Sequence, residues 1–138
     1  MATNAAASVK QSLGRALHHG EEDIFDTFYR IFLDSDPRVR EQFLNTDWEE
    51  QKRLLRQGVN KVIGFYEGSV TSQHALDRIR HTHGRERLNI PPELYHFWVE
   101  SMIEAVREHD PEFSPTLEQQ WRDVLRHGTD FVRAGYEE

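Results

Sequence analysis

Apolar residues recur along this chain at intervals of three and four, the spacing that places them on one face of an α-helix. Leu55, Val59, Val62 and Ile63 show the pattern in the middle of the chain. Apolar and polar residues nowhere alternate over a stretch long enough for a β-strand, and no internal repeat or low-complexity tract is found. We therefore predict an all-α chain.

The periodic segments and the residues that interrupt them predict six to seven helices. Asp36-Pro37 and Ser114-Pro115 each combine a capping side chain with a proline suited to the first turn. Gly58 lies inside a predicted helix, where glycine costs about 1 kcal/mol relative to alanine, so we expect another backbone to pass close to it. The predicted helices span about residues 5–18, 21–34, 37–43, 47–67, 69–83, 93–109 and 114–132.

Length and composition bound the class of protein. The 138 residues, of which 37% are hydrophobic, are enough for one core, so we expect a single domain over residues 1–138. The net charge of −7, with arginines and carboxylates interspersed, argues against nucleic acid as a partner. No apolar stretch approaches the roughly 20 residues that span a bilayer, and residues 1–10 lack the apolar core of a secretory signal. We expect no membrane association and a cytoplasmic location.

The chain has no cysteine, which removes zinc-thiolate sites, iron–sulfur clusters and cysteine nucleophiles together. A di-iron site in a helical bundle needs paired Glu-x-x-His motifs, and only Glu93–His96 provides one. Motifs of serine hydrolases and phosphate-binding glycine loops are absent as well. Any metal must be held by histidine, tyrosine or carboxylate.

The segment 79–95 carries the strongest candidate among the eight histidines. His83 follows Ile79 by one helical turn and shares its apolar face, whereas His81 is rotated away. Other histidines, such as His109 and His127, look like surface residues near helix ends. A histidine aimed from a helix end into an apolar pocket can hold a metal cofactor axially, and a core histidine bonded to a carbonyl remains the alternative on spacing alone.

Three further motifs lie in the first third of the chain: Phe28-Tyr29, the run Pro37-Arg38-Val39-Arg40, and Phe43. With the order of the helices, they resemble the globin family over nearly the whole chain. The similarity is to bacterial single-domain haemoglobins and the haem domain of flavohaemoglobins in particular. It implies a globin fold of six to seven helices around a pocket for haem b.

The resemblance also implies roles for individual residues. His83 matches the proximal ligand of the iron, and Tyr95 the tyrosine that contacts it; a slightly longer segment between them keeps His81 as a second candidate. Gln51 and Leu55 match residues that face the bound ligand, although Leu54 and Gln57 leave that register open. The expected catalytic residues are Tyr29, Gln51 and Tyr95, and the expected haem contacts are Phe28, Phe43, Leu55, Val59, Ile79, His83, Ile90 and Trp98.

A globin of this type is expected to bind O₂, NO or CO, with Tyr29 and Gln51 donating hydrogen bonds to the ligand. Nitric oxide dioxygenase or peroxidase-like activity would need an external reductase, because the chain has no room for a flavin domain. A gas- or redox-sensing module, acting as a homodimer or through a partner, is the alternative, as is a globin fold without haem. Sequence does not separate carrier, dioxygenase, peroxidase and sensor, since one pocket supports all of them.

Overall fold

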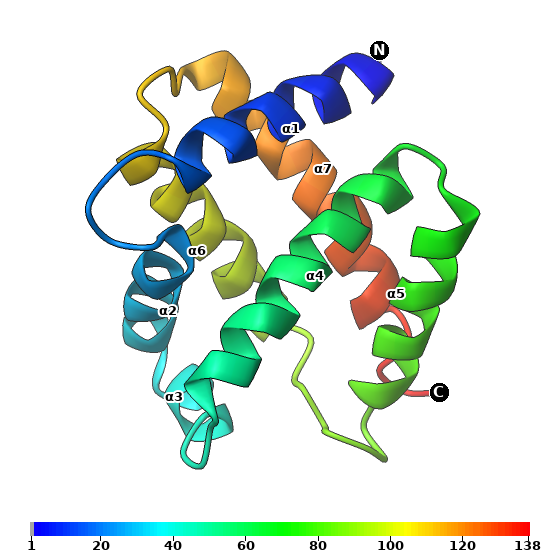
Figure 1. The fold of residues 1–138 in the computed structure, drawn as a ribbon. Helices are drawn as coiled ribbons and strands as arrows, with labels where there is room; N and C mark the ends of the chain where they lie inside the picture. Colours follow the sequence, from blue (N-terminus) through cyan, green and yellow to red (C-terminus); the bar gives the residue numbers. More distant parts are fainter. Residues whose placement is uncertain (1) are drawn as a thin grey trace.

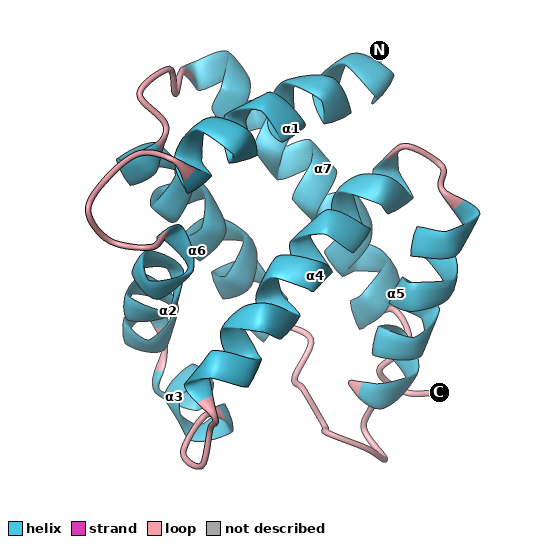
Figure 2. Ribbon diagram, in the orientation of Figure 1, coloured by secondary structure: helices cyan, strands magenta, loops and turns pink. Residues whose placement is uncertain are grey.

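The computed structural model describes residues 2–138, with side chains from residue 5 onward, and Met1 lies outside it. This part of the chain forms helices and no strand, so the all-α prediction is confirmed (Figure 2). The helices are α1 (Ala2–Leu17), α2 (Ile24–Ser35), α3 (Pro37–Gln42), α4 (Trp48–Tyr66), α5 (Val70–Thr82), α6 (Leu94–His109) and α7 (Pro115–Arg133).

Side-chain caps fix where several helices begin. The Ser114 hydroxyl accepts a hydrogen bond from the backbone N–H of Leu117 at 3.1 Å, and the Asp36 carboxylate accepts one from Arg38 at 2.8 Å. Each cap satisfies an N–H that has no partner within the helix. The cap-plus-proline pairs seen in the sequence therefore start α7 and α3 as predicted.

The beginning of α2 differs from the prediction. This helix starts at Ile24 rather than near residue 21, because the Asp23 carboxylate caps it by accepting from the N–H of Phe25 at 2.7 Å. Gly20 has a φ of +90°, a conformation that ends the preceding segment and suits glycine. The acidic residues 21 and 22 therefore belong to the loop between α1 and α2.

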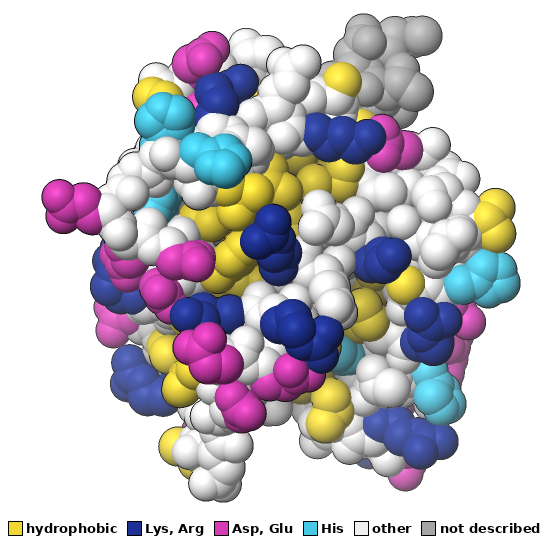
Figure 3. Space-filling view, viewed as in Figure 1, with side chains coloured by type: hydrophobic (Ala, Val, Ile, Leu, Met, Phe, Trp, Pro, Cys, Tyr) yellow, Lys and Arg dark blue, Asp and Glu magenta, His cyan; other side chains and the backbone are white. Residues whose placement is uncertain are grey.

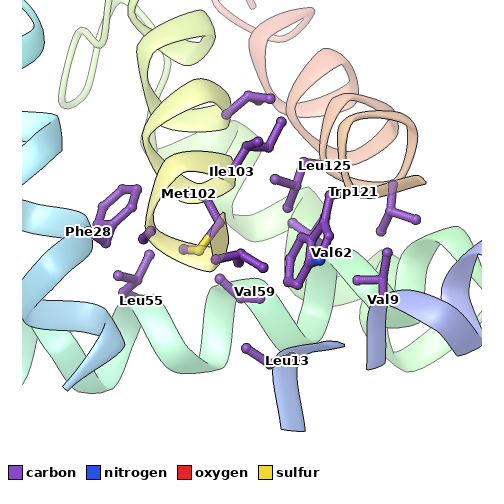
Figure 4. Packing of buried hydrophobic residues seen from close by; sticks show 14 of the residues in the cluster. Val9, Leu13, Phe28, Leu55, Val59, Val62, Met102, Ile103, Trp121 and Leu125 are labelled. Carbon is purple, nitrogen blue, oxygen red and sulfur yellow. The ribbon is translucent and has the colours of Figure 1, made fainter. Parts of the chain in front are cut away.

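Helix α4 crosses the molecule between α2 and α3 on one side and α5 on the other (Figure 1). Helix α2 packs along α6, and α7 contacts α1, α4, α5 and α6. Val59 and Val62 of α4 lie near Met102 of α6 and Leu125 of α7 in the centre of the molecule (Figure 4). These residues are buried, Val59, Met102 and Leu125 completely, so the hydrophobic core forms where α4, α6 and α7 meet.

Two other glycines, not Gly58, are the points of close helix contact. A Cβ added at Gly58 would have no atom within 4 Å, so the predicted close approach of another backbone there is wrong. A Cβ at Gly128 would lie 2.9 Å from Val62, and one at Gly64 would overlap Ser72. Glycine thus lets α7 and α5 approach α4.

His109 is buried, although the sequence suggested a surface residue near a helix end. Its side chain is 6% exposed and bridges two elements. Nδ1 donates to the carbonyl of His19 at 2.9 Å, and Nε2 lies 2.7 Å from the hydroxyl of Thr27. The ring therefore holds the α1–α2 loop and α2 against the end of α6.

The next residue, Asp110, joins α6 to α1. Its carboxylate has no exposed surface and accepts from Ser12 at 2.6 Å and from Arg15 at 2.7 and 3.0 Å. Ser12 in turn accepts from the indole N–H of Trp121 at 2.9 Å. Three helices, α1, α6 and α7, are thereby connected through one buried polar network.

Charged side chains of both signs cover the face shown in Figure 3, with lysine and arginine beside aspartate and glutamate. Hydrophobic side chains show between them where α1, α2 and α4 approach one another. Over residues 2–138, none of the helices has the length and apolar character needed to cross a membrane.

Candidate functional site

His83 caps the C-terminal end of α5 and has one ring nitrogen fixed by a hydrogen bond. Its Nδ1 lies 2.9 Å from the carbonyl oxygen of Ile79, one turn earlier in the helix. A carbonyl can only accept, so Nδ1 carries the hydrogen, and in the neutral ring the lone pair lies on Nε2. His83 can therefore bond the Ile79 carbonyl through one ring nitrogen and remain able to bind a metal through the other.

Burial determines the protonation state of His83. It lowers the pKa of the imidazole, and the hydrogen bond to Ile79 opposes this only in part. A lowered pKa keeps the ring neutral at neutral pH, which is the form that binds a metal. His81, the second candidate, is exposed, whereas His83 is half-buried. The greater burial of His83 therefore favours it over His81 as the metal ligand.

Tyr29 of α2 and Gln51 of α4 form a pair. Tyr29 is 6% exposed, and its oxygen accepts from Nε2 of Gln51 at 3.0 Å. The Tyr29 hydroxyl is 3.5 Å from the backbone oxygen of Gln51, at the outer limit of a hydrogen bond. Burial raises the pKa of Tyr29 to about 12, against a lowering by the bond from Gln51. The hydroxyl therefore keeps a proton that is only weakly engaged.

Two aromatic rings lie beside Tyr29. Phe43, after α3, meets it edge-on with ring centroids 5.7 Å apart, and Trp48, the first residue of α4, does so at 5.1 Å. Phe43 and Trp48 stack on each other at 5.7 Å. Trp48 was not among the residues expected at the site. Its position three residues before Gln51, on the same face of one helix, was the signal available.

The burial of side chains along α4 shows which of them face the core. Leu55 is 5% exposed and Val59 is fully buried, while Leu54 is 46% exposed and Gln57 is also exposed. Leu55 therefore lies on the inner face with Gln51, and Leu54 and Gln57 do not. Phe28, on α2, is also fully buried within this core.

The remaining expected contacts, Ile79, Ile90, Tyr95 and Trp98, are half-buried, as is Phe43. Of these residues, Phe43, Ile79, Tyr95 and Trp98 pack against the core cluster. Trp98 also meets Phe28 edge-on at 6.1 Å. Large apolar side chains that are only partly covered leave apolar surface for another group to bury.

Tyr95 is half-buried in the first turn of α6. Burial raises its pKa, opposed by the nearby charge of Arg133. The second nitrogen of His83, which Tyr95 was expected to contact, has the carbonyl of Ile79 as its partner. Among the described residues, Tyr95 therefore makes no hydrogen bond to His83.

The chain is similar to the crystal structure of the protein PA3967 from Pseudomonas aeruginosa, described as structurally highly homologous to a human hemoglobin. The two are 36% identical with a TM-score of 0.90, and the match covers 97% of this chain and 99% of that one. The chain belongs to the globin family. No family model and no curated protein matches it.

In this globin, the segment after His83 is held by residues that follow α7. The N–H of Arg85 donates to the carbonyl of Tyr136 at 2.8 Å, and the Tyr136 hydroxyl donates to the side chain of Asn89 at 2.5 Å. Asn89 has a φ of 53°, which few residues other than glycine and asparagine adopt. The segment that the sequence marked as longer than the family pattern is therefore an ordered turn.

The acidic residues at the end of the chain belong to this same contact. Glu138 pairs with Arg80 at 2.5 Å and Glu137 with Arg85 at 3.2 Å. Both carboxylates thus bond arginines of the segment around His83 and not the imidazole. Within residues 2–138, no group of three or more histidine or acidic side chains is placed to hold a metal ion by itself.

Proposed function

We propose that this globin binds haem b through Nε2 of His83 and takes up O₂, NO or CO on the side of Tyr29. The observation that carries the proposal is the hydrogen bond from Nδ1 of His83 to Ile79, because it fixes the ring orientation and leaves the other nitrogen with its lone pair. The half-buried apolar residues on several elements supply surface for a flat apolar cofactor.

The donor chemistry of the site fits haem and does not fit a bare metal ion. A porphyrin brings four nitrogen ligands of its own, so one imidazole of the protein would be enough to hold haem. His83 is neutral and half-buried, as such a ligand must be. Metal ions without a macrocycle need several protein ligands, and no such group is present among the described residues.

When bound, haem would supply an iron that can take up a diatomic ligand. This chain's residues would bind and orient that ligand. Tyr29 can turn its hydroxyl from the long contact with Gln51 to a polar ligand, and the amide of Gln51 holds the tyrosine oxygen in place. A hydrogen bond to a charge-bearing partner contributes about 1.5–3 kcal/mol, so a polar ligand such as O₂ is retained better than CO.

The same residues would support oxidation of nitric oxide or peroxidase-like turnover if an external reductase supplied electrons. Tyr29 and Gln51 would hold the reacting ligand, and His83 would keep its orientation through Ile79.

Reconstitution of the protein with haemin tests the proposal. The expected result is a Soret band that develops with one equivalent of haemin and is lost in His83→Ala. His81→Ala is the matched control, since His81 lies on the same helix end but is exposed, and it should retain the band. A wild-type protein without the band, or a band that depends on His81 instead, would overturn the assignment.

A further inference from the structure

Trp48 is the aromatic residue of the site with the greatest contact to solvent. Its side chain is 38% exposed, while Tyr29 behind it is 6% exposed. The Trp48 ring meets Tyr29 edge-on at 5.1 Å and stacks on Phe43 at 5.7 Å. The partly exposed indole of Trp48 therefore packs against the nearly buried ring of Tyr29.

The local structure explains why the ring has this position. Asp47 caps α4 by accepting from the N–H of Glu50, which makes Trp48 the first helical residue. Trp48 and Gln51 are one turn apart on the same face, so one turn of α4 contacts Tyr29 twice, through the Trp48 ring and through the Gln51 amide. Lys52 adds an ion pair with Asp26 at 3.2 Å that joins this turn to α2.

Trp48 is one of several large apolar side chains that are exposed. The four others are Leu44, Leu54, Val70 and Leu88, and none of them carries an aromatic ring that packs on Tyr29. Trp48 differs because its ring packs on Tyr29, a buried residue with a hydrogen-bonding group, while part of Trp48 touches solvent.

We propose that Trp48 is the cover of the Tyr29–Gln51 pair and sets the size of the ligand that reaches it. The proposal rests on the proposed haem site, with Tyr29 as the donor to the ligand. A diatomic ligand needs only a small displacement of the indole, whereas a bulky ligand needs the ring to leave both Tyr29 and Phe43. Trp48 is thus a specificity-determining residue for access rather than a group that reacts.

The first experiment uses the protein without haem and measures access to Tyr29. Tetranitromethane nitrates accessible tyrosines, and mass spectrometry of peptides gives the rate at each one. In Trp48→Ala the nitration of Tyr29 should become about tenfold faster, which corresponds to about 1.4 kcal/mol. Trp48→Phe should restore most of the protection, and the rate at Tyr66 in the same samples should not change. An unchanged rate at Tyr29 overturns the cover.

The second experiment uses the haem-loaded protein and compares association rates of CO and n-butyl isocyanide. Trp48→Ala should increase the association rate of the isocyanide about ten times as much as that of CO, which corresponds to about 1.4 kcal/mol. Leu54→Ala is the matched control, an exposed apolar residue of the same helix, and should leave the ratio of the two rates as it is. Equal changes for both ligands overturn the size selection.

The two experiments separate this inference from the proposed function. If wild-type protein does not take up haemin, the haem site is wrong, and the nitration rates still decide whether Trp48 covers Tyr29. If haemin binds and Trp48→Ala changes neither nitration nor the ratio of rates, the haem site stands and the cover is refuted. Circular dichroism of each variant shows that a faster rate does not come from loss of the fold.

Discussion

Asp110 offers the sharpest test of how this fold is held together. Replacing it with asparagine keeps the shape of the side chain and removes the charge that Arg15 needs. The carboxylate has no exposed surface and accepts from Arg15, Ser12 and the backbone N–H of Glu112 at 2.6 to 3.0 Å. An asparagine presents N–H groups to at least one of these donors, so at least one bond becomes a repulsive contact.

The size of the effect follows from the burial of the two partners. Removing one member of a buried ion pair costs about 3–5 kcal/mol. Arg15 is 25% exposed and keeps a longer contact with Glu112 at 3.6 Å, so part of its charge remains solvated. We therefore expect Asp110→Asn to lower the free energy of unfolding by about 3 kcal/mol, at the lower end of that range.

The pH dependence adds a second, independent expectation. Burial raises the pKa of Asp110, but the bonds from Arg15 and Ser12 outweigh it, and the net pKa is lowered. A carboxyl with a lowered pKa stabilises the fold above the pKa of the unfolded chain, about 3.9. The difference between wild type and Asp110→Asn should be constant near neutral pH and shrink as the pH falls below about 4.

Urea unfolding followed by tryptophan fluorescence measures both expectations, and Trp121 reports directly because its indole bonds Ser12 in the same network. Asp34→Asn is the matched control: Asp34 pairs with Arg40, but its side chain is 87% exposed. This change should alter stability by less than about 0.5 kcal/mol. A loss at Asp110 no larger than that at Asp34 would refute the reasoning.

Three further predictions concern the site and the helix contacts. Tyr29→Phe should speed O₂ dissociation from the haem-loaded protein about tenfold to a hundredfold, because a bond of about 1.5–3 kcal/mol is lost, and stopped-flow replacement by CO measures it; an unchanged rate would remove the role of the hydroxyl. Gly58→Ala should raise the free energy of unfolding by up to about 1 kcal/mol, since its Cβ meets no atom within 4 Å. Gly128→Ala should lower it by about 1–3 kcal/mol, because its Cβ would lie 2.9 Å from Val62. Denaturant unfolding measures both changes, and a Gly128→Ala variant more stable than Gly58→Ala would contradict the packing described. Burial lowers the pKa of His83, so the unfolded chain takes up this proton first, and stability of the haem-free protein should decline as the pH falls below about 6.5; a pH profile of His83→Gln identical to that of wild type would show that the ring does not contribute.

Much of the fold was predictable because local rules decide it. The periodicity of apolar residues predicts the helices, and capping residues such as Asp36 and Ser114 place their ends. The start of α2 was misplaced, because Glu21 and Glu22 suit a first helical turn as well as Asp23 suits a cap, and only the observed bond to Phe25 decides between them. Local propensity was ambiguous at that point.

Contacts between distant parts of the chain were not predictable in the same way. Gly58 and Gly128 look alike in the sequence, since each lies within a helix, but only Gly128 has another helix against it. His109 resembles other histidines at helix ends until the α1–α2 loop brings the carbonyl of His19 to its ring. In both cases the deciding neighbour is far away in sequence.

In the candidate site too, some features were predictable from the sequence and others were not. Residue type and spacing single out Tyr29, Gln51 and His83 and the resemblance to globins, and the family is shown by the similarity to a solved structure. The pairing of Tyr29 with Gln51, the hydrogen on Nδ1 of His83 and the covering ring of Trp48 exist only in the folded chain.

The sequence by itself thus determined which segments are helical, which faces are apolar and which residue types could serve a haem. These properties depend on neighbours within one or two turns. The tertiary structure alone decided the buried network of Asp110, the contact of the chain end with the segment after His83 and the cover over Tyr29. Each depends on burial and on partners from other helices, because charge, hydrogen bonds and access change in strength when water is excluded.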